Sequence, residues 1–162
     1  MKRDKNSIFL ILHDIRSVQN VGSIFRTADA AGVSKIFLTG YTPSPIDRFK
    51  RERKDFIKVS LGAEKSVSWE EHSDILSLIK GLRKKEVVIV SVEQAPQARD
   101  YRTLCVNAPA AFIYGNEVNG LSQEILNMSD DIVEIPMKGS KESLNVSVSV
   151  GISLFRLLEN VG

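Results

Sequence analysis

The chain has 162 residues, a formal net charge of +2, and ordinary shares of hydrophobic (43%) and charged (26%) residues. This length and composition predict one domain, residues 1–162, with one hydrophobic core. No apolar run approaches the roughly 20 residues that span a bilayer, and no signal-peptide pattern is present, so we expect a cytoplasmic protein with no membrane partner. Cys105 is the only cysteine, and together with His13 and His72 it does not make a metal site.

The first part of the chain alternates strand and helix patterns. The continuous apolar run from Ile8 to Leu12 has the length and composition of a buried parallel strand. A helix pattern starts near Asn20 and stops at Gly32, and a second strand follows from Lys35 to Thr39. This order predicts a β-α-β unit in an α/β fold, with a mostly parallel sheet and helices on both faces.

The middle of the chain begins with a strongly charged stretch. Residues 47–58 carry six basic and three acidic side chains, a local charge of +3, which suits either a solvated loop or an arm that contacts phosphates. From Trp69 to Lys85, apolar residues mark one face of an amphipathic helix with a basic end. A strand is expected from Val87 to Val92, and a short helix or turn around residues 100–104.

The last third of the chain predicts two strands that each end in a glycine turn. The strand from Ala110 to Tyr114 runs into Gly115, and the strand from Ile132 to Ile135 runs toward Gly139, with a short helix between them. Such turns place backbone groups against a small ligand at the carboxyl edge of a sheet. The helix expected from Ser143 to Asn160 is apolar nearly all round, so we expect its own sheet and a second subunit to cover it.

Two familiar nucleotide sites do not fit the sequence. Gly115 to Gly120 has the glycine spacing of a triphosphate-binding loop, but Leu121-Ser122 stands where lysine and a hydroxyl are required. Ser17 to Gly22 stands where a dinucleotide site needs its glycine-rich turn. What remains is a ligand without a long phosphate chain, held by the backbone of the glycine turns and by apolar walls.

Three segments together carry a family resemblance. They run from Asn20 to Ala28, from Gly115 to Ser122, and from Ile135 to Met137 followed by Ser143 to Ser147. In this order they resemble the motifs of the SpoU (TrmH-like) family of SPOUT RNA methyltransferases, in its minimal single-domain form. The resemblance implies an S-adenosylmethionine-dependent methyltransferase acting on ribose 2′-hydroxyls of tRNA or rRNA, a carboxyl-terminal trefoil knot, and a homodimer packed through the knotted region.

The resemblance also implies a cofactor site in the bend formed by the last two motifs. Its residues match family positions that line S-adenosylmethionine, or supply apolar surface that can wall an adenine. The residues expected to contact the cofactor are Gly115, Ile135, Leu144, Met137 and Val92.

Five polar residues match the catalytic positions of the family: Arg26, Asn20, Glu117, Ser143 and Asn145. Arg26 matches the catalytic arginine, but a free guanidinium keeps its proton, so phosphate binding is a surer role for it than proton abstraction. Asn20 and Arg26 lie about 240° apart on an ideal helix, so we expect Asn20 in the non-helical entry, where it can also act as an N-cap. Ser143 is a possible cap of the last helix, and Glu117 is expected to orient Arg26 or Asn145.

RNA binding is expected on the surface of the dimer, because the chain resembles members without an accessory RNA-binding domain. The candidate phosphate contacts are Arg16, Arg48, Lys50, Arg51 and Arg53, together with the basic group Arg83-Lys84-Lys85. Two alternatives stay open: methylation of a base instead of the ribose, and a non-catalytic RNA-binding dimer. The Ser143-Leu144-Asn145 motif argues against base methylation.

Overall fold

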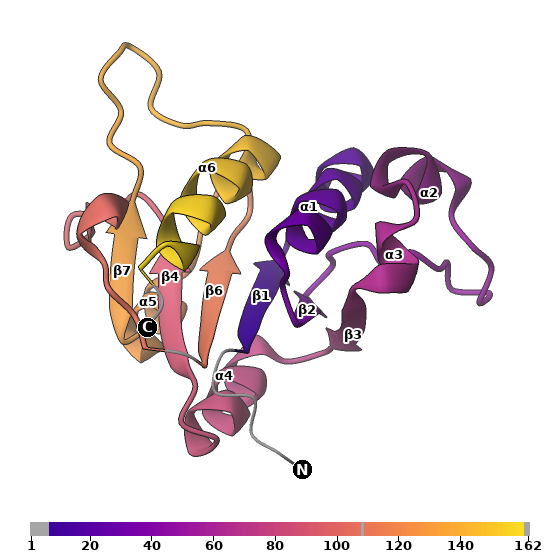
Figure 1. The fold of residues 1–162 in the computed structure, drawn as a ribbon, viewed down its shortest axis with the longest axis horizontal. Coiled ribbons are helices and arrows are strands. Elements are labelled where there is room, and N and C mark those ends of the chain that lie inside the picture. Colours follow the sequence, from indigo (N-terminus) through magenta and orange to yellow (C-terminus); the bar gives the residue numbers. More distant parts are fainter. Residues whose placement is uncertain (1–6, 108, 161–162) are drawn as a thin grey trace.

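The computed structural model describes residues 7–107 and 109–160, and its centre is one seven-stranded sheet (Figure 1). The strand order is β3-β2-β1-β6-β4-β7-β5, and all neighbouring strands are parallel. The strands are β1 (Ile8–His13), β2 (Lys35–Thr39), β3 (Ser68–His72), β4 (Val88–Val92), β5 (Arg99–Asp100), β6 (Ala110–Tyr114) and β7 (Asp131–Glu134). The expected α/β class and parallel sheet are confirmed.

The central strands are buried on both faces, as their continuous apolar sequences predict. In β1, Leu10 belongs to the hydrophobic cluster on one face of the sheet and Ile11 to the cluster on the other. Leu12 lies opposite Leu38 of β2 and Tyr114 of β6, so β1 is an interior strand paired on both sides. Two cores therefore sandwich the sheet, one under each layer of helices.

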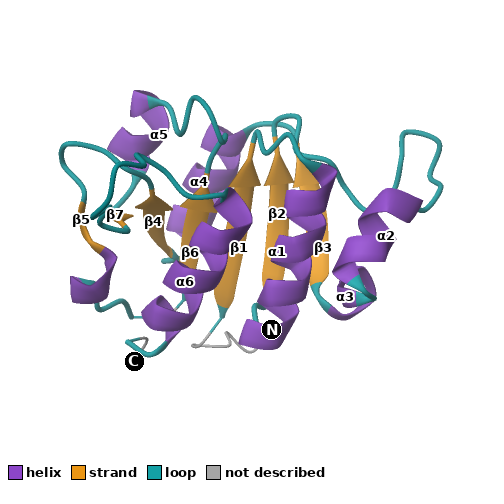
Figure 2. Cartoon of the chain, turned by 90° about the horizontal axis from the view of Figure 1, so that it is seen from above, coloured by secondary structure: helices purple, strands orange, loops and turns teal. Residues whose placement is uncertain are grey.

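Helices cover both faces of the sheet (Figure 2). The helices are α1 (Val18–Ala31), α2 (Lys54–Ser60), α3 (Ala63–Ser66), α4 (Ile75–Lys84), the 3-10 helix η1 (Tyr101–Thr103), α5 (Gln123–Met128) and α6 (Val146–Leu158). On one face α1 and α6 pack side by side, and α2 and α3 pack against α1. On the other face α4 and α5 bury their apolar residues against the second core. None of the helices in the described ranges is long and apolar enough to cross a bilayer.

The structure corrects two predicted elements. The segment from Trp69 to His72 is not helical: it lies in β3, a parallel edge strand paired with β2, and the amphipathic helix begins only at Ile75. An edge strand has one open side, so its polar sequence does not show the apolar run of a central strand. The charged stretch also contains a helix, because α2 begins at Lys54.

Because the strands are parallel, all of their carboxyl ends meet at one edge of the sheet, the upper edge in Figure 1. This edge carries the loop from β1 to α1, the loop from β2 to α2, the turn after β6 and the segment between β7 and α6. The three motif segments are thereby brought together. The end of α4, with Arg83, lies at the opposite edge.

Candidate functional site

A pocket lies at the carboxyl ends of β4, β6 and β7, beside the start of α6. All five residues predicted to contact a cofactor line it: Val92, Gly115, Ile135, Met137 and Leu144. Their side chains and backbone come from three strand ends and from the segment before α6, so the sheet topology creates the pocket. Sequence reasoning missed other lining residues: Glu93, Gln94, Tyr114, Asn116, Glu134, Val146 and Ser149.

The turn from Gly115 to Gly120 is held in shape by side-chain acceptors on both sides. Asn116 is buried, and its Oδ1 accepts from the backbone N–H groups of Val118 at 2.8 Å and Asn119 at 2.7 Å. Glu93 Oε2 accepts from the backbone N–H of Leu121 at 2.8 Å. Gly120 has φ of +64°, and a Cβ there would lie 2.5 Å from Glu93 Oε2, so only glycine fits this position without strain.

Three carboxylates, those of Glu93, Glu117 and Glu134, line the pocket beside its apolar walls. Burial raises the pKa of Glu93, although hydrogen bonds from the backbone of Leu121 and Gln94 oppose the rise. Acidic groups beside apolar walls favour a ligand that carries positive charge. Within residues 7–107 and 109–160, no group of His, Cys, Asp and Glu side chains is arranged to hold a metal ion.

A chain of side-chain hydrogen bonds joins all three motif segments beside the pocket. Asn145 Nδ2 donates to Asn20 Oδ1 at 3.2 Å, and Asn20 Nδ2 donates to Glu117 Oε1 at 3.5 Å. The backbone N–H of Arg16 donates to the other Glu117 oxygen at 3.4 Å. Glu117 therefore orients Asn20, whereas the sequence predicted that it orients Arg26 or Asn145.

The helix caps differ from the prediction. Ser17 is the N-cap of α1 and its side chain accepts from the backbone N–H of Asn20, so Asn20 lies in the first helical turn and not in the entry. Asn145, not Ser143, caps α6 by accepting from the backbone N–H of Ser147 at 2.9 Å. Asn and Ser are both favoured at N-caps, so local preference does not choose between them.

Arg26 lies apart from this chain of hydrogen bonds. It is exposed on α1 and does not line the pocket, and among the described residues it has no hydrogen-bond or ion-pair partner. Since Asn20 and Arg26 are both helical, they point about 240° apart around α1. The other four predicted catalytic residues lie in the pocket or in the hydrogen-bonded chain beside it.

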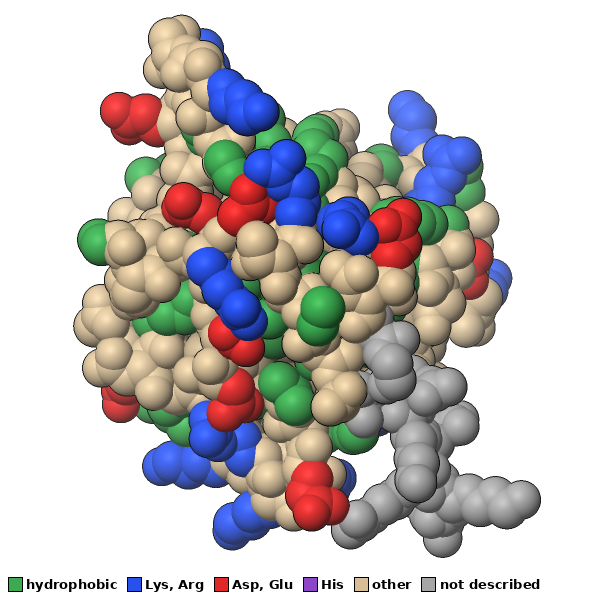
Figure 3. All heavy atoms as spheres, turned by 60° about the vertical axis from the view of Figure 1, so that its left-hand side comes forward, with side chains coloured by type: hydrophobic (Ala, Val, Ile, Leu, Met, Phe, Trp, Pro, Cys, Tyr) green, Lys and Arg blue, Asp and Glu red, His purple; other side chains and the backbone are tan. Residues whose placement is uncertain are grey.

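The predicted RNA-binding residues divide between the two edges of the sheet. Arg16 and the four basic residues of the loop after β2 lie on the same edge as the pocket. Arg83 lies on the opposite edge, where it pairs with Asp130 at 3.0 Å and donates to the backbone oxygen of Met128. Figure 3 shows Lys and Arg side chains on both the upper and the lower part of one face, interspersed with acidic ones.

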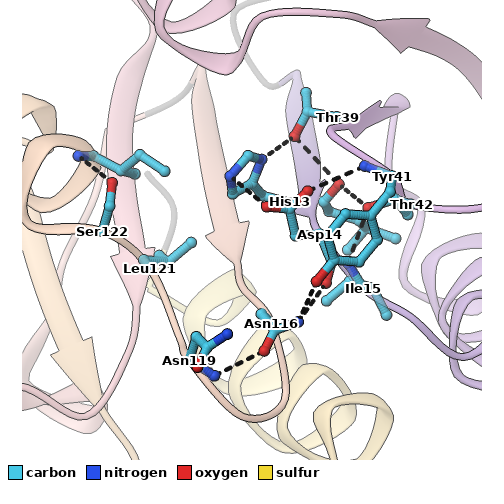
Figure 4. Close-up of polar contacts among 12 residues, drawn as sticks. His13, Asp14, Ile15, Thr39, Tyr41, Thr42, Asn116, Asn119, Leu121 and Ser122 are labelled. Carbon is cyan, nitrogen blue, oxygen red and sulfur yellow. Dashed lines mark hydrogen bonds and ion pairs between the residues drawn. The ribbon is translucent and has the colours of Figure 1, made fainter.

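A second polar network connects the loops after β1 and β2 with the turn after β6 (Figure 4). Asn116 Nδ2 donates to the Asp14 backbone oxygen at 2.9 Å and to Tyr41 Oη at 2.6 Å. The Asp14 carboxylate accepts from the backbone N–H of Tyr41 at 3.1 Å. Burial lowers the pKa of His13, and the neighbouring Asp14 carboxylate partly offsets this effect.

Comparisons with known proteins agree with this geometry. The family model described as the SpoU rRNA methylase family matches residues 7–155. A tRNA (guanosine(18)-2′-O)-methyltransferase of Thermus thermophilus is 29% identical over 158 residues, which cover 96% of this chain and 76% of that protein. A 23S rRNA (guanosine-2′-O-)-methyltransferase of Photobacterium profundum is 30% identical over 155 residues, which cover 96% of this chain and 60% of that protein.

A solved structure is similar across nearly the whole chain. The crystal structure of an AdoMet-bound rRNA methyltransferase from Sinorhizobium meliloti superposes with a TM-score of 0.87 at 28% identity. The match covers 98% of this chain and 58% of that one. This chain thus spans between about half and three quarters of the length of these relatives.

Proposed function

Because the chain belongs to the SpoU rRNA methylase family, we propose that residues 1–162 form one methyltransferase domain that transfers a methyl group from S-adenosylmethionine to a ribose 2′-hydroxyl of RNA. The relatives described above act on tRNA or on rRNA, so both are candidate substrates, and we propose that the protein works in the cytoplasm. The observation that carries the proposal is the meeting of three distant motif segments, through Asn20, Glu117 and Asn145, beside the pocket.

The pocket has the chemistry that S-adenosylmethionine requires. Its apolar walls, which include Ile135 and Leu144, suit an adenine ring. Its carboxylates suit the positive sulfonium and ammonium groups of the cofactor. A free volume of about 100 Å³ is smaller than the roughly 300–1,000 Å³ of typical small-molecule sites. We therefore propose that the exposed segment 138–144, which precedes the cap residue Asn145, shifts outward to admit the cofactor.

The reaction depends mainly on the alignment of the methyl group with the ribose hydroxyl. The bond between the methyl carbon and sulfur breaks as the bond to the ribose oxygen forms, so sulfur loses its positive charge and the hydroxyl loses its proton. Holding the two atoms in line supplies much of the rate enhancement in such transfers. The hydrogen-bonded chain from Glu117 to Asn145 holds three polar side chains in fixed positions beside the pocket. Arg26 is proposed to bind a phosphate of the substrate.

A homodimer is the proposed assembly, supported by an apolar stripe on α6. Val148, Ile152 and Phe155 are exposed and recur at spacings of four and three residues, which places them on one side of the helix, and Leu144 is exposed just before its N-cap. Apolar surface of this kind marks interfaces, and Leu144 also lines the pocket. Sedimentation of Ile152→Glu tests the assembly, because a charge in the stripe should convert dimers to monomers.

A trefoil knot is proposed for the carboxyl-terminal part. Its support is the path of the chain after β7, which returns past β4 and β6 to place α6 beside α1. Such threading is rare in proteins, and pattern reasoning does not predict it. Pulling on the two ends tests the knot, because a tightened knot leaves the extended chain shorter than an unknotted chain of the same length.

The test of the proposed activity uses labelled S-adenosylmethionine with purified tRNA and rRNA, followed by digestion and mass spectrometry of the modified nucleotide. Label on the ribose supports the proposal, and label on a base supports the alternative of base methylation. Absence of transfer to any RNA, with RNA binding retained, would favour the non-catalytic RNA-binding dimer.

A further inference from the structure

The loop between β2 and α2 carries an aromatic ring that the core does not use. Phe49 is 61% exposed, and the guanidinium carbons of Arg48 and Arg51 lie 4.7 and 4.9 Å from the centre of its ring. The loop borders an open groove of about 1040 Å³, lined by residues 42–44 and 46–55 and by Glu71. An exposed ring in contact with two cations, beside a groove of this size, is suited to a flat, negatively charged ligand.

The tip of this loop is pre-formed. The Asp47 carboxylate accepts from the backbone N–H groups of Phe49 at 2.7 Å and Arg51 at 3.0 Å, and from Arg51 Nε at 3.0 Å. These donors, first the backbone of Arg51, hold the pKa of Asp47 below its usual value. Lys50 takes a φ of +63° to complete the turn, so the position of Phe49 does not have to be ordered when a ligand binds.

The charges of the loop leave two cations free. Its acidic side chains are already paired, Asp47 with Arg51, Asp55 with Arg53 at 3.6 Å and Glu52 with Lys65 at 3.9 Å. Arg48 and Lys50 are exposed, and neither has an ion-pair partner among residues 7–107 and 109–160. They flank Phe49 on both sides in sequence and are available to phosphates.

A second exposed ring lies nearer the pocket. Tyr41 is 58% exposed, but both ends of the residue are fixed, by the Asp14 carboxylate at its backbone N–H and by Asn116 at its hydroxyl (Figure 4). Asn116 is the residue before Glu117, so the ring lies at the border of the hydrogen-bonded chain. The loop after β2 therefore presents one ring beside the candidate active site and another at its basic tip.

We propose that the loop after β2 binds an unpaired segment of the substrate RNA, with one base stacked on Phe49, another on Tyr41, and the intervening phosphates neutralised by Arg48 and Lys50. The proposal rests on the proposed RNA methyltransferase function and specifies its substrate as single-stranded at this contact. Every base has a face that can stack on an aromatic ring, whereas bases inside a duplex are covered by their neighbours.

The test compares fluorescence-anisotropy binding of a short single-stranded RNA with that of a duplex, using the full-length chain. Phe49→Leu, which keeps an apolar side chain but removes the ring, should weaken single-strand binding about tenfold and leave duplex binding nearly unchanged. Phe49→Trp should retain single-strand affinity. Leu61→Ala is the matched control, because Leu61 is 64% exposed and does not line the groove.

The possible outcomes separate the two proposals. If Phe49→Leu binds the single strand like the wild type, or loses single-strand and duplex binding equally, the stacking role is overturned. The same holds if an acidic protein, and not RNA, binds the loop. Methyl transfer by the wild-type chain is measured in parallel: loss of the stacking effect with transfer intact overturns only this inference, whereas absence of both RNA binding and transfer overturns the proposed function.

Discussion

The side-chain amide of Asn145 donates to the side-chain oxygen of Asn20 across 3.2 Å, although the two residues are 125 positions apart in the chain. The direction of this hydrogen bond is set by the helix cap. Asn145 Oδ1 already accepts from the backbone N–H and the hydroxyl of Ser147, so only its NH₂ group can face Asn20. Asn20 then presents its own NH₂ group to Glu117, so the cap of α6 fixes the orientation of every member of the chain.

Asn145→Asp should therefore separate catalysis from stability. Aspartate caps a helix as well as asparagine does, so the free energy of unfolding should change little. Its carboxylate cannot donate to Asn20 Oδ1 and adds a charge near Glu117, so methyl transfer should fall at least tenfold. Transfer kinetics and urea unfolding measure the two effects. Asn145→Ala is the comparison, because it also removes the cap and should cost about 1 kcal/mol of stability.

Arg26 offers a test of how the subunits cooperate. It points away from Asn20 on α1, so we expect it to serve the site of the other subunit in the proposed dimer. Arg26→Ala and Asn145→Asp should each reduce methyl transfer at least tenfold when assayed alone. In a refolded equimolar mixture of the two variants, about half of the dimers contain one subunit of each kind. Each such dimer has one complete site out of two, so about one quarter of all sites should be active.

The measurement is methyl transfer after unfolding and refolding the two variants together, with each variant refolded alone as the control. No activity in the mixture would show that Arg26 serves its own subunit's site. Binding of S-adenosylmethionine should be unchanged in Arg26→Ala, since Arg26 does not line the pocket.

The sequence predicted the central strands well, because β1 and β6 are buried on both faces and their apolar runs have no other stable placement. It did not predict β3, whose sequence from Ser68 to His72 is mostly polar because an edge strand leaves one side open. The strand order was also beyond reach, because β6 inserts between β1 and β4 through pairings that no local pattern encodes.

Part of the site was predictable from local sequence signals. The turn at Gly115 and the apolar residues after the strand ends are local signals, and the structure gathers them in one pocket, although Gly139 of the second predicted turn does not line it. Glu93 was missed because its partner, Leu121, is 28 positions away and a single glutamate after a strand carries no pattern. The cap of α1 could have been read from Ser17, a favoured N-cap residue three positions before Asn20.

The two glycine turns should respond differently to an added methyl group. Gly120→Ala forces a left-handed backbone on alanine and places its Cβ against the Glu93 carboxylate, so the turn beside the pocket should distort. We expect affinity for S-adenosylmethionine, measured by calorimetry, to fall at least tenfold. In Gly139→Ala the new Cβ has no heavy atom within 4 Å, so this variant is the matched control and should bind normally.

A buried hydroxyl pair joins β6 to α6. Ser153 Oγ donates to the Ser149 backbone oxygen, so the Tyr114 hydroxyl must be the donor in its 2.7 Å contact with Ser153. Tyr114→Phe should cost about 1 kcal/mol of unfolding free energy, because Ser153 keeps its acceptor. Ser153→Ala should cost more, about 1–3 kcal/mol, because the buried tyrosine hydroxyl loses its partner.

The double variant Tyr114→Phe with Ser153→Ala completes a double-mutant cycle with the two single variants and the wild type. It should recover part of the loss seen in Ser153→Ala, since no buried hydroxyl is then left without a partner. Chemical denaturation of all four proteins measures the coupling. Simple addition of the two single losses would show that the hydroxyls do not interact.

Glu93 predicts a pH dependence of stability with a definite sign. Burial raises the pKa of its carboxyl above the ordinary value of about 4.5, so the folded state binds this proton more tightly than the unfolded state. The stabilisation from the protonated carboxyl is fully present below about pH 4.5 and is lost as pH rises through the raised folded-state pKa. Relative to Glu93→Gln, whose side chain does not titrate, the wild type should therefore lose unfolding free energy as pH rises from about 4 to neutrality.

Taking the difference in unfolding free energy between the two proteins at each pH removes the contribution of other titrating groups. A difference that is flat over this range, or that grows in favour of the wild type, would mean that the hydrogen bonds from the backbone of Leu121 and Gln94 offset or exceed the effect of burial on the pKa of Glu93.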